Sequence, residues 1–326
     1  CAQDLAVQPG PFHLGIVEDV VRLHLLEADA PGLLERTVVA DRATVGREDL
    51  NAERSLLHEA PEALVGFEAG RVGAYSTLQG LTWSGRDQSL YRADIYPDDD
   101  TRASGSNPEN DFGWNASNGN INYIWDVAYR GVLRSNLILQ QLETTDRLTA
   151  EQKARFAGEA KFVRAYFNFL LTRFYGTPPV ITAPATNVEE TRKPNSAPGE
   201  VWDLMEADLE DAIKGLAGLN LETGRASEWA ARALLGKVEL YRAQWGTGDA
   251  AILKGVSPQA KYQEAAAHLQ EVVNSRRFSL VPYENNFKHT TENNAESIFE
   301  LQASFGTDIN GWAGADENGG GASSGT

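Results

Sequence analysis

Residues 150–181 read AEQKARFAGEAKFVRAYFNFLLTRFYGTPPVI, and the rest of the chain is organised around this stretch. Its apolar residues recur at alternating steps of four and three, which places one row of them on a single helical face: Phe156, Ala160, Val163, Phe167, Leu170 and Phe174. A second row, Phe162, Tyr166 and Phe169, lies beside the first. So wide an apolar surface predicts a core helix that is buried on more than one side.

The polar residues of the same stretch predict which part of the helix is exposed to solvent and where the helix ends. The side chains expected in water near its start are Lys153, Arg155, Glu159, Lys161 and Arg164. Gly176 is expected to end the helix, and Pro178 and Pro179 prevent its continuation. The periodicity requires no catalytic group here.

The composition bounds the kind of protein. A chain of 326 residues with 42% hydrophobic content can bury a sizeable core in one large domain or two ordinary ones. It has no apolar run of about 18 residues, the length that suggests a helix spanning a bilayer. The net charge of −17 argues against nucleic-acid binding and against simple electrostatic adsorption to anionic lipid, because both need clustered Lys and Arg.

The chain has a single cysteine, Cys1, so it can form no intramolecular disulfide and no cysteine-based metal cluster. A cysteine at the first position is typical of a mature lipoprotein, in which the signal peptide has been removed and the cysteine carries lipid. The alternative is an arbitrary boundary of the chain. We expect residues 1–13 to be a lipidated leash and residues 14–326 to form a single, mainly α-helical domain.

Apolar periodicity predicts five more helices, at residues 60–81, 123–142, 198–216, 228–245 and 258–274. Ser227 is a suitable N-cap for the fourth of these. The last two resemble a tetratricopeptide helix pair in their order of small and large residues, although the loop between them is longer than in a standard repeat. Residues 122–275 are therefore expected to form a helical-repeat core.

Two other regions carry further expectations. The third of these helices has an acidic side that predicts a solvated face and not a catalytic pair: Glu206, Asp208, Glu210 and Asp211. Residues 276–326 are expected to be irregular, with few short strands at residues 278–281, 286–287 and 296–301. Their Gly- and Ser-rich tail indicates either a flexible end or a chain that is cut short.

Residues 83–121 interrupt the helical pattern with a long segment rich in Gly, Asn, Asp and Ser. Loops of this length are uncommon in compact domains and are often functional. The segment has aromatic rings among polar side chains: Trp83, Tyr91, Tyr96, Phe112 and Trp114. Rings stack on the C–H faces of sugars, and amides and carboxylates bind their hydroxyls, so a carbohydrate site is one interpretation. The alternative is that these rings pin the loop to the core.

Signals for other chemistry are weak. The five histidines lack the spacing of a helical metal pair, and neither a phosphate-binding loop nor a nucleophile elbow is present. Asp98, Asp99 and Asp100 could contribute to a Ca²⁺ site, but without the full loop pattern a solvated acidic turn is favoured. We expect no cofactor. The residues alone indicate a lipid-anchored binding protein, with an extracytoplasmic glycoside hydrolase as the alternative.

Six segments in chain order resemble the SusD/RagB family. The central one, EAKFVRAYFNFLLTRFYGTPPVI, is similar to the family's signature helix and its Gly-Pro end, and IWDVAYRGVLRSNLILQQLE is similar to the helix before it. The later segments are VWDLMEADLEDAIKGL, GRASEWAARALLGKVELYRAQW, YQEAAAHLQEVVNSRRFSLVPYENNF and NNAESIFELQ. The resemblance covers residues 121–305, and Cys1 matches the lipidated position.

This resemblance implies an outward-facing outer-membrane lipoprotein without catalytic activity. Such proteins capture oligosaccharides, or in some members peptides, for a TonB-dependent SusC-like transporter. By analogy with the glycan-binding members, we expect the ligand to contact Trp83, Arg86, Tyr91, Asp98, Trp114, Asn115 and Trp312. Family members usually continue past Thr326, so part of the binding face is expected to be missing. A helical-repeat scaffold that binds only protein is a further alternative.

Overall fold

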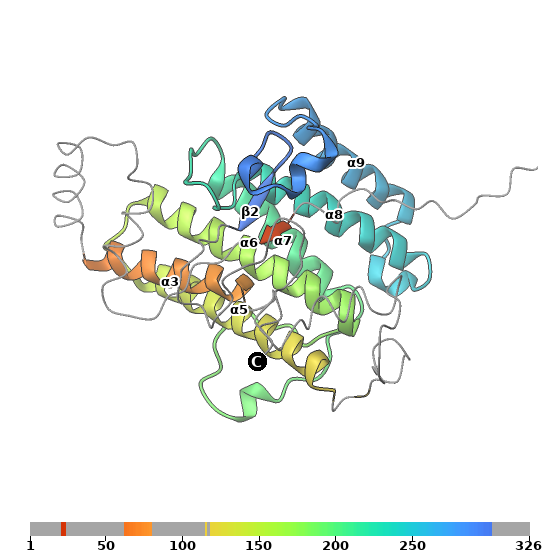
Figure 1. The fold of residues 1–326 in the computed structure, drawn as a ribbon. Helices are drawn as coiled ribbons and strands as arrows, with labels where there is room; N and C mark the ends of the chain where they lie inside the picture. Colours follow the sequence, from red (N-terminus) through yellow and green to blue (C-terminus); the bar gives the residue numbers. More distant parts are fainter. Residues whose placement is uncertain (1–20, 24–61, 80–114, 116–117, 302–326) are drawn as a thin grey trace, which may run out of the picture.

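The computed structural model describes residues 21–23, 62–79, 115 and 118–301. Among these residues, six α-helices pack side by side (Figure 1): α3 (Glu62–Gln79), α5 (Gly119–Thr144), α6 (Ala150–Tyr175), α7 (Glu200–Leu216), α8 (Glu228–Gly246) and α9 (Pro258–Asn274). Four short 3₁₀ turns lie in the described loops: η2 (Glu189–Thr191), η3 (Ala250–Leu253), η4 (Tyr283–Phe287) and η5 (His289–Thr291). The mainly helical fold that the periodicity predicts is confirmed.

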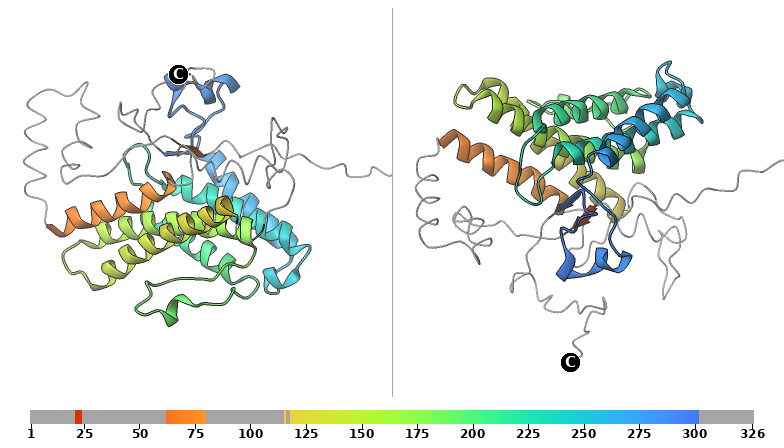
Figure 2. Two further views of the ribbon diagram at one scale, coloured as in Figure 1. Left: turned by 60° about the horizontal axis from the view of Figure 1, so that its bottom comes forward. Right: turned by 90° about the horizontal axis from the view of Figure 1, so that it is seen from above.

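The helices stack in chain order, each against the next, so that α3 and α9 lie at opposite ends (Figures 1 and 2). The helix α6 lies in the middle of this stack and contacts α3, α5, α7 and α8. Both apolar rows of the central stretch contribute to the core, since Phe156, Phe162, Phe167 and Phe169 are all buried. The prediction of a core helix buried on more than one side is confirmed.

Local chemistry sets the ends of α6. The side chain of Thr149 accepts a hydrogen bond from the Gln152 amide at 3.2 Å, and the Gln152 side chain accepts one from the Thr149 amide at 2.9 Å. This reciprocal capping box satisfies two amides that the first helical turn leaves without partners. At the other end Gly176 adopts a φ of 78°, which favours glycine, and stops the helix as predicted.

Two of the side chains predicted to lie in water on α6 are buried, so that part of the prediction is wrong. The Glu159 side chain is fully buried and accepts hydrogen bonds from Arg71 of α3 at 3.0 Å and from Arg155 at 3.2 Å. Arg164 donates to both carboxylate oxygens of Asp208 on α7, at 2.6 and 2.8 Å. Each charge is tolerated in the core because an opposite charge meets it there.

The acidic side of α7 is likewise only partly solvated. Asp208 is 2% exposed because it faces Arg164, and the Glu206 side chain is 13% exposed because it faces α8 and α9. Glu210 and Asp211 lie on the exposed side, as predicted. Neither Asp208 nor Glu206 is free for acid–base chemistry, since both carboxylates form ion pairs with Arg or Lys side chains.

The helices α8 and α9 form the predicted tetratricopeptide-like pair. Ser227 caps α8 through a hydrogen bond from the Ala230 amide at 3.2 Å, which confirms the predicted N-cap. At the crossing, a Cβ added to Gly236 would lie 2.7 Å from Cγ of Leu269. Glycine at this position therefore allows the two helices to approach closely, as the small-residue pattern of a repeat requires.

A short parallel strand pair joins distant parts of the described chain. The strand β1 (Val21–Leu23) pairs with β2 (Phe299–Leu301), with Val21 opposite Phe299. The strand predicted at residues 296–301 is thus confirmed for residues 299–301. Residues 278–281 form no strand, and residues 286–287 belong to η4. Tyr283 and Phe287 of that turn are exposed and so pack on no sheet face within the described residues.

Candidate ligand-binding site

Most candidate binding residues lie outside the part of the chain that the structure describes. These are Trp83, Arg86, Tyr91, Asp98, Trp114 and Trp312, together with the lipidation candidate Cys1 and the acidic turn at residues 98–100. Asn115 is described, and it is exposed, with its backbone carbonyl accepting a hydrogen bond from the Asn118 amide at 2.9 Å. Within the described ranges, no group of His, Cys, Asp or Glu is arranged to hold a metal ion.

The C-terminal end of the candidate binding segment, residues 83–121, is anchored where α5 begins. The Asn118 side chain accepts a hydrogen bond from the Ile121 amide at 3.1 Å and so caps the first turn of α5. The hydroxyl of Tyr175, the last residue of α6, donates to the carbonyl of Ile121. The end of α6 therefore fixes the point at which the segment enters the helical stack.

Half-buried aromatic rings surround this junction. The ring of Trp125 lies 4.7 Å from that of Tyr129 and meets that of Tyr175 edge-on at 4.9 Å. The Tyr129 hydroxyl donates to the carbonyl of Pro179 at 2.8 Å. Aromatic pairs of this geometry stabilise a contact beyond the area they bury. The ring group formed by Trp125, Tyr129 and Tyr175 thus binds α5 to the end of α6.

Burial keeps both phenols of this ring group neutral. It raises the pKa of Tyr175 to about 12, and it raises the pKa of Tyr129 well above its ordinary value. Each hydroxyl therefore remains a hydrogen-bond donor across the physiological range. Their partners are the backbone carbonyls of Ile121 and Pro179, so both hydroxyls hold parts of the helical stack together.

Sequence reasoning did not single out these three rings. Trp125 and Tyr129 are four residues apart and fall on one helical face, a spacing that is also typical of plain core residues. Tyr175 comes directly before the glycine that ends α6. The available signal was their position beside the irregular segment, because residues at such a junction serve both the helix and the loop.

The described helices contain no segment that is both long and apolar enough to cross a bilayer. Their buried carboxylates at Glu159 and Asp208 are held by guanidinium groups. Helices that stack in chain order, with tetratricopeptide-like pairing of α8 and α9, define the class of helical-repeat proteins. Proteins of this class bind ligands on the surfaces that the stacked repeats create.

Comparisons with known proteins show similarity to one family. A SusD-like family model described as "Starch-binding associating with outer membrane" matches residues 88–240. A "SusD-like protein" of Bacteroides ovatus is 26% identical over 186 residues, which are 56% of this chain and 33% of that protein. The chain is therefore similar to SusD-like proteins, in agreement with the resemblance that its sequence motifs indicate.

Solved structures show the same similarity. A "Laminarin binding SusD-like protein" is 26% identical, with a TM-score of 0.59 over 72% of this chain and 50% of that one. A SusD superfamily protein from Parabacteroides distasonis is 25% identical, with a TM-score of 0.63 over 74% of this chain and 51% of that one. The chain thus spans about half the length of these structures and about a third of the Bacteroides ovatus relative.

Proposed function

We propose that this protein captures a neutral oligosaccharide at the cell surface through the irregular segment 83–121. The observation that supports the proposal is the family match at residues 88–240, which covers most of this segment together with the helices that support it. A 26% identical relative is named for binding laminarin. The net charge of −17 disfavours polyanionic glycans, because like charges repel.

In this proposal, the aromatic residues of the segment stack on sugar rings and its polar residues bind the hydroxyls. The stacking residues are Trp83, Tyr91 and Trp114, with Trp312 contributed by the C-terminal region. Arg86, Asp98 and Asn115 are the polar partners. The ring group at the start of α5 keeps the segment's C-terminal end in place during binding, which lowers the ordering cost of association.

Binding to immobilised laminarin and starch tests the segment directly. Trp114→Ala should weaken binding by about five- to thirtyfold, because the loss of one stacked ring costs on the order of 1–2 kcal/mol. Tyr283→Ala is the matched control, since Tyr283 is an exposed ring outside the segment and should leave affinity unchanged. Full affinity after replacement of all four stacking residues would remove the segment from the proposal.

We further propose that the protein is a lipid-anchored outer-membrane component that delivers its ligand to a TonB-dependent, SusC-like transporter. The family description includes association with the outer membrane, and a lipid on Cys1 would tether the chain. Detergent extraction of the native protein, followed by mass spectrometry, should recover a transporter barrel and a modified Cys1. An unmodified protein that purifies without a partner would contradict this part of the proposal.

The proposed activity is capture without chemistry and without a cofactor. Incubation of the purified protein with each glycan that it binds should leave the chain length of the glycan unchanged. Shortened products that disappear in a binding-deficient variant would favour the glycoside hydrolase alternative instead.

A further inference from the structure

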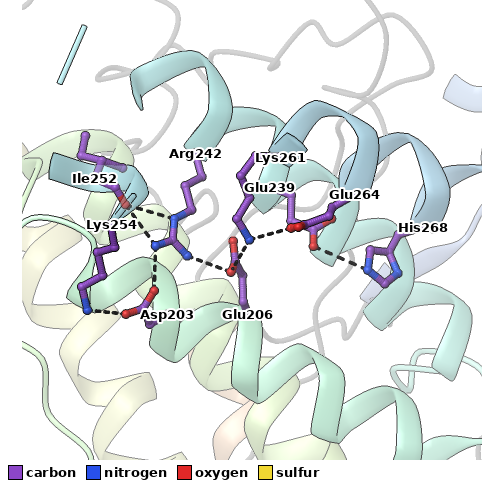
Figure 3. A network of polar contacts seen from close by, with 9 residues as sticks. All are labelled: Asp203, Glu206, Glu239, Arg242, Ile252, Lys254, Lys261, Glu264 and His268. Carbon is purple, nitrogen blue, oxygen red and sulfur yellow. Dashed lines mark hydrogen bonds and ion pairs between the residues drawn. The ribbon is translucent and has the colours of Figure 1, made fainter. Parts of the chain in front are cut away.

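The interface between α7, α8 and α9 holds a network of charged side chains (Figure 3). Its centre is Arg242 of α8, which is 3% exposed and donates to Asp203 at 2.7 Å and to Glu206 at 2.8 Å. The same guanidinium donates to the carbonyl of Ile252 at 3.0 and 3.2 Å. These bonds join α7, α8 and the loop that follows α8.

Lys261 extends the network to α9. Its ammonium contacts Glu206 at 2.9 Å and Glu264 at 2.7 Å, and its side chain is 9% exposed. Lys254 contacts the second oxygen of Asp203. Arg242, Lys254 and Lys261 are therefore each engaged with Asp203, Glu206 or Glu264.

Glu239 of α8 is the carboxylate in this network without a lysine or arginine partner. It is 4% exposed, and its nearest polar contact is Nε2 of His268 on α9, 3.5 Å from Oε1. Within the described residues, Oε2 of Glu239 and Nδ1 of His268 have no hydrogen-bond partner. Four carboxylates in the network face three permanent cations, so the cluster is one positive charge short.

We propose that Glu239, which faces His268, holds one exchangeable proton that completes this charge balance, and that its loss above neutral pH loosens α9 from α8. Neutral His268 can already donate from Nε2 to the carboxylate, so the effect of the added proton is on charge: bound to Glu239, it cancels the excess negative charge of the cluster. Without it, a buried carboxylate remains without a compensating cation, and that is costly in an interior of low dielectric constant.

The surroundings of Glu239 agree with this proposal. Burial raises its pKa to about 8, with Glu206, Glu264 and Glu210 raising it further by repulsion and Lys261 opposing them. These groups face Glu239 from α7 and α9, so both neighbouring helices set its proton affinity. Since the ordinary pKa is 4.5, the folded protein binds this proton more tightly than the unfolded chain does.

The sign of the pH effect follows from that difference. The stabilisation is complete below about pH 4.5 and is lost as the pH rises toward about 8. Across this window one bound proton changes the unfolding equilibrium constant by up to about tenfold per pH unit. We expect α9 to show the loss first, because among the described helices it is the last of the stack and packs mainly on α8.

Hydrogen exchange on the full chain tests the proposal. Protection factors of α9 amides should fall between pH 5 and pH 8.5 in the natural protein and stay nearly constant in Glu239→Gln, which imitates the protonated carboxyl. The control is Glu271→Gln, because Glu271 also joins α9 to α8, through Arg232, but is 53% exposed. This control should retain the pH dependence of the natural protein, and an equal fall in Glu239→Gln would overturn the proposal.

A second measurement follows the Glu239 carboxyl itself, first in the natural protein. With ¹³C-labelled glutamate carboxyls, the Glu239 signal should titrate near pH 8. His268→Leu should move that midpoint upward, because leucine cannot donate a hydrogen bond to the carboxylate. A midpoint near the ordinary value of 4.5 would overturn the bound proton, and a midpoint unchanged by His268→Leu would overturn the role of His268.

Discussion

Individual charged residues in the core of this protein work as pairs across helices. Glu159 is the clearest case, because its fully buried side chain is held by Arg71 from another helix and by Arg155 from its own. The sequence predicted that the Glu159 and Arg164 side chains face solvent, because a charged residue on a helix is usually exposed. Their partners Arg71 and Asp208 are 88 and 44 residues away, and no local pattern reveals such a contact.

Replacement of Glu159 should therefore be costly. Glu159→Gln keeps the shape of the side chain but removes the one fully buried carboxylate that contacts Arg71, whose side chain is 6% exposed. The other two carboxylates on Arg71, Glu68 and Glu222, are more exposed to water. We expect a loss of about 3 kcal/mol in the free energy of unfolding, measured by urea denaturation. Glu189→Gln breaks an exposed pair with Arg192 and should have no measurable effect. Equal effects of both variants would mean that the buried pair adds nothing.

At the scale of single elements, the sequence is most informative. The predicted helix 258–274 has the bounds of α9, and the predicted helices 60–81, 123–142 and 228–245 differ from α3, α5 and α8 by at most four residues at either end. Periodicity is a local signal, so it can be read from the sequence without knowledge of the fold. The candidate binding residues came from the composition of the 83–121 segment and from the family resemblance, because the sequence does not distinguish a ring that stacks on a sugar from one that packs in a core.

The contact between α5 and α6 depends on a glycine. A Cβ added at Gly131 would lie 2.1 Å from the ring of Phe167, which is completely buried. Gly131→Ala should destabilise the protein by about 2 kcal/mol in thermal or urea unfolding, since a buried ring has little room to move. Gly73→Ala on α3 is the matched control, because nothing lies within 4 Å of its added Cβ.

That control should gain about 0.5 kcal/mol, because alanine is the better helix former. The opposite signs expected for two identical substitutions separate close packing from helix propensity. A stabilising Gly131→Ala would show that α5 and α6 can move apart at this point.

At the scale of the whole molecule, the strand pair closes the helical stack. Phe299 of β2 contacts Tyr75 of α3 at 6.5 Å and Phe162 of α6 at 5.2 Å, measured between ring centroids. It is 7% exposed and pairs with Val21 of β1. One residue of the C-terminal described region thus contacts two helices and the N-terminal strand, an arrangement that no sequence pattern could reveal.

Phe299→Ala should cost about 3–4 kcal/mol in the free energy of unfolding, the usual range for a buried phenylalanine. It should also reduce hydrogen-exchange protection of residues 299–301 more than that of α8. Phe287→Ala is the control, because that ring is 54% exposed and should change stability by less than about 0.5 kcal/mol. Comparable losses in both variants would contradict the closing role of Phe299.

The pairing of Val21 with Phe299 also orders the events of biosynthesis. Each helix of the stack meets its neighbour soon after leaving the ribosome, because successive helices are in contact. The first strand, by contrast, emerges early, and its partner is translated only after every described helix. Contacts of such sequence separation form slowly. The N-terminal strand therefore lacks its partner strand until residues 299–301 have been translated.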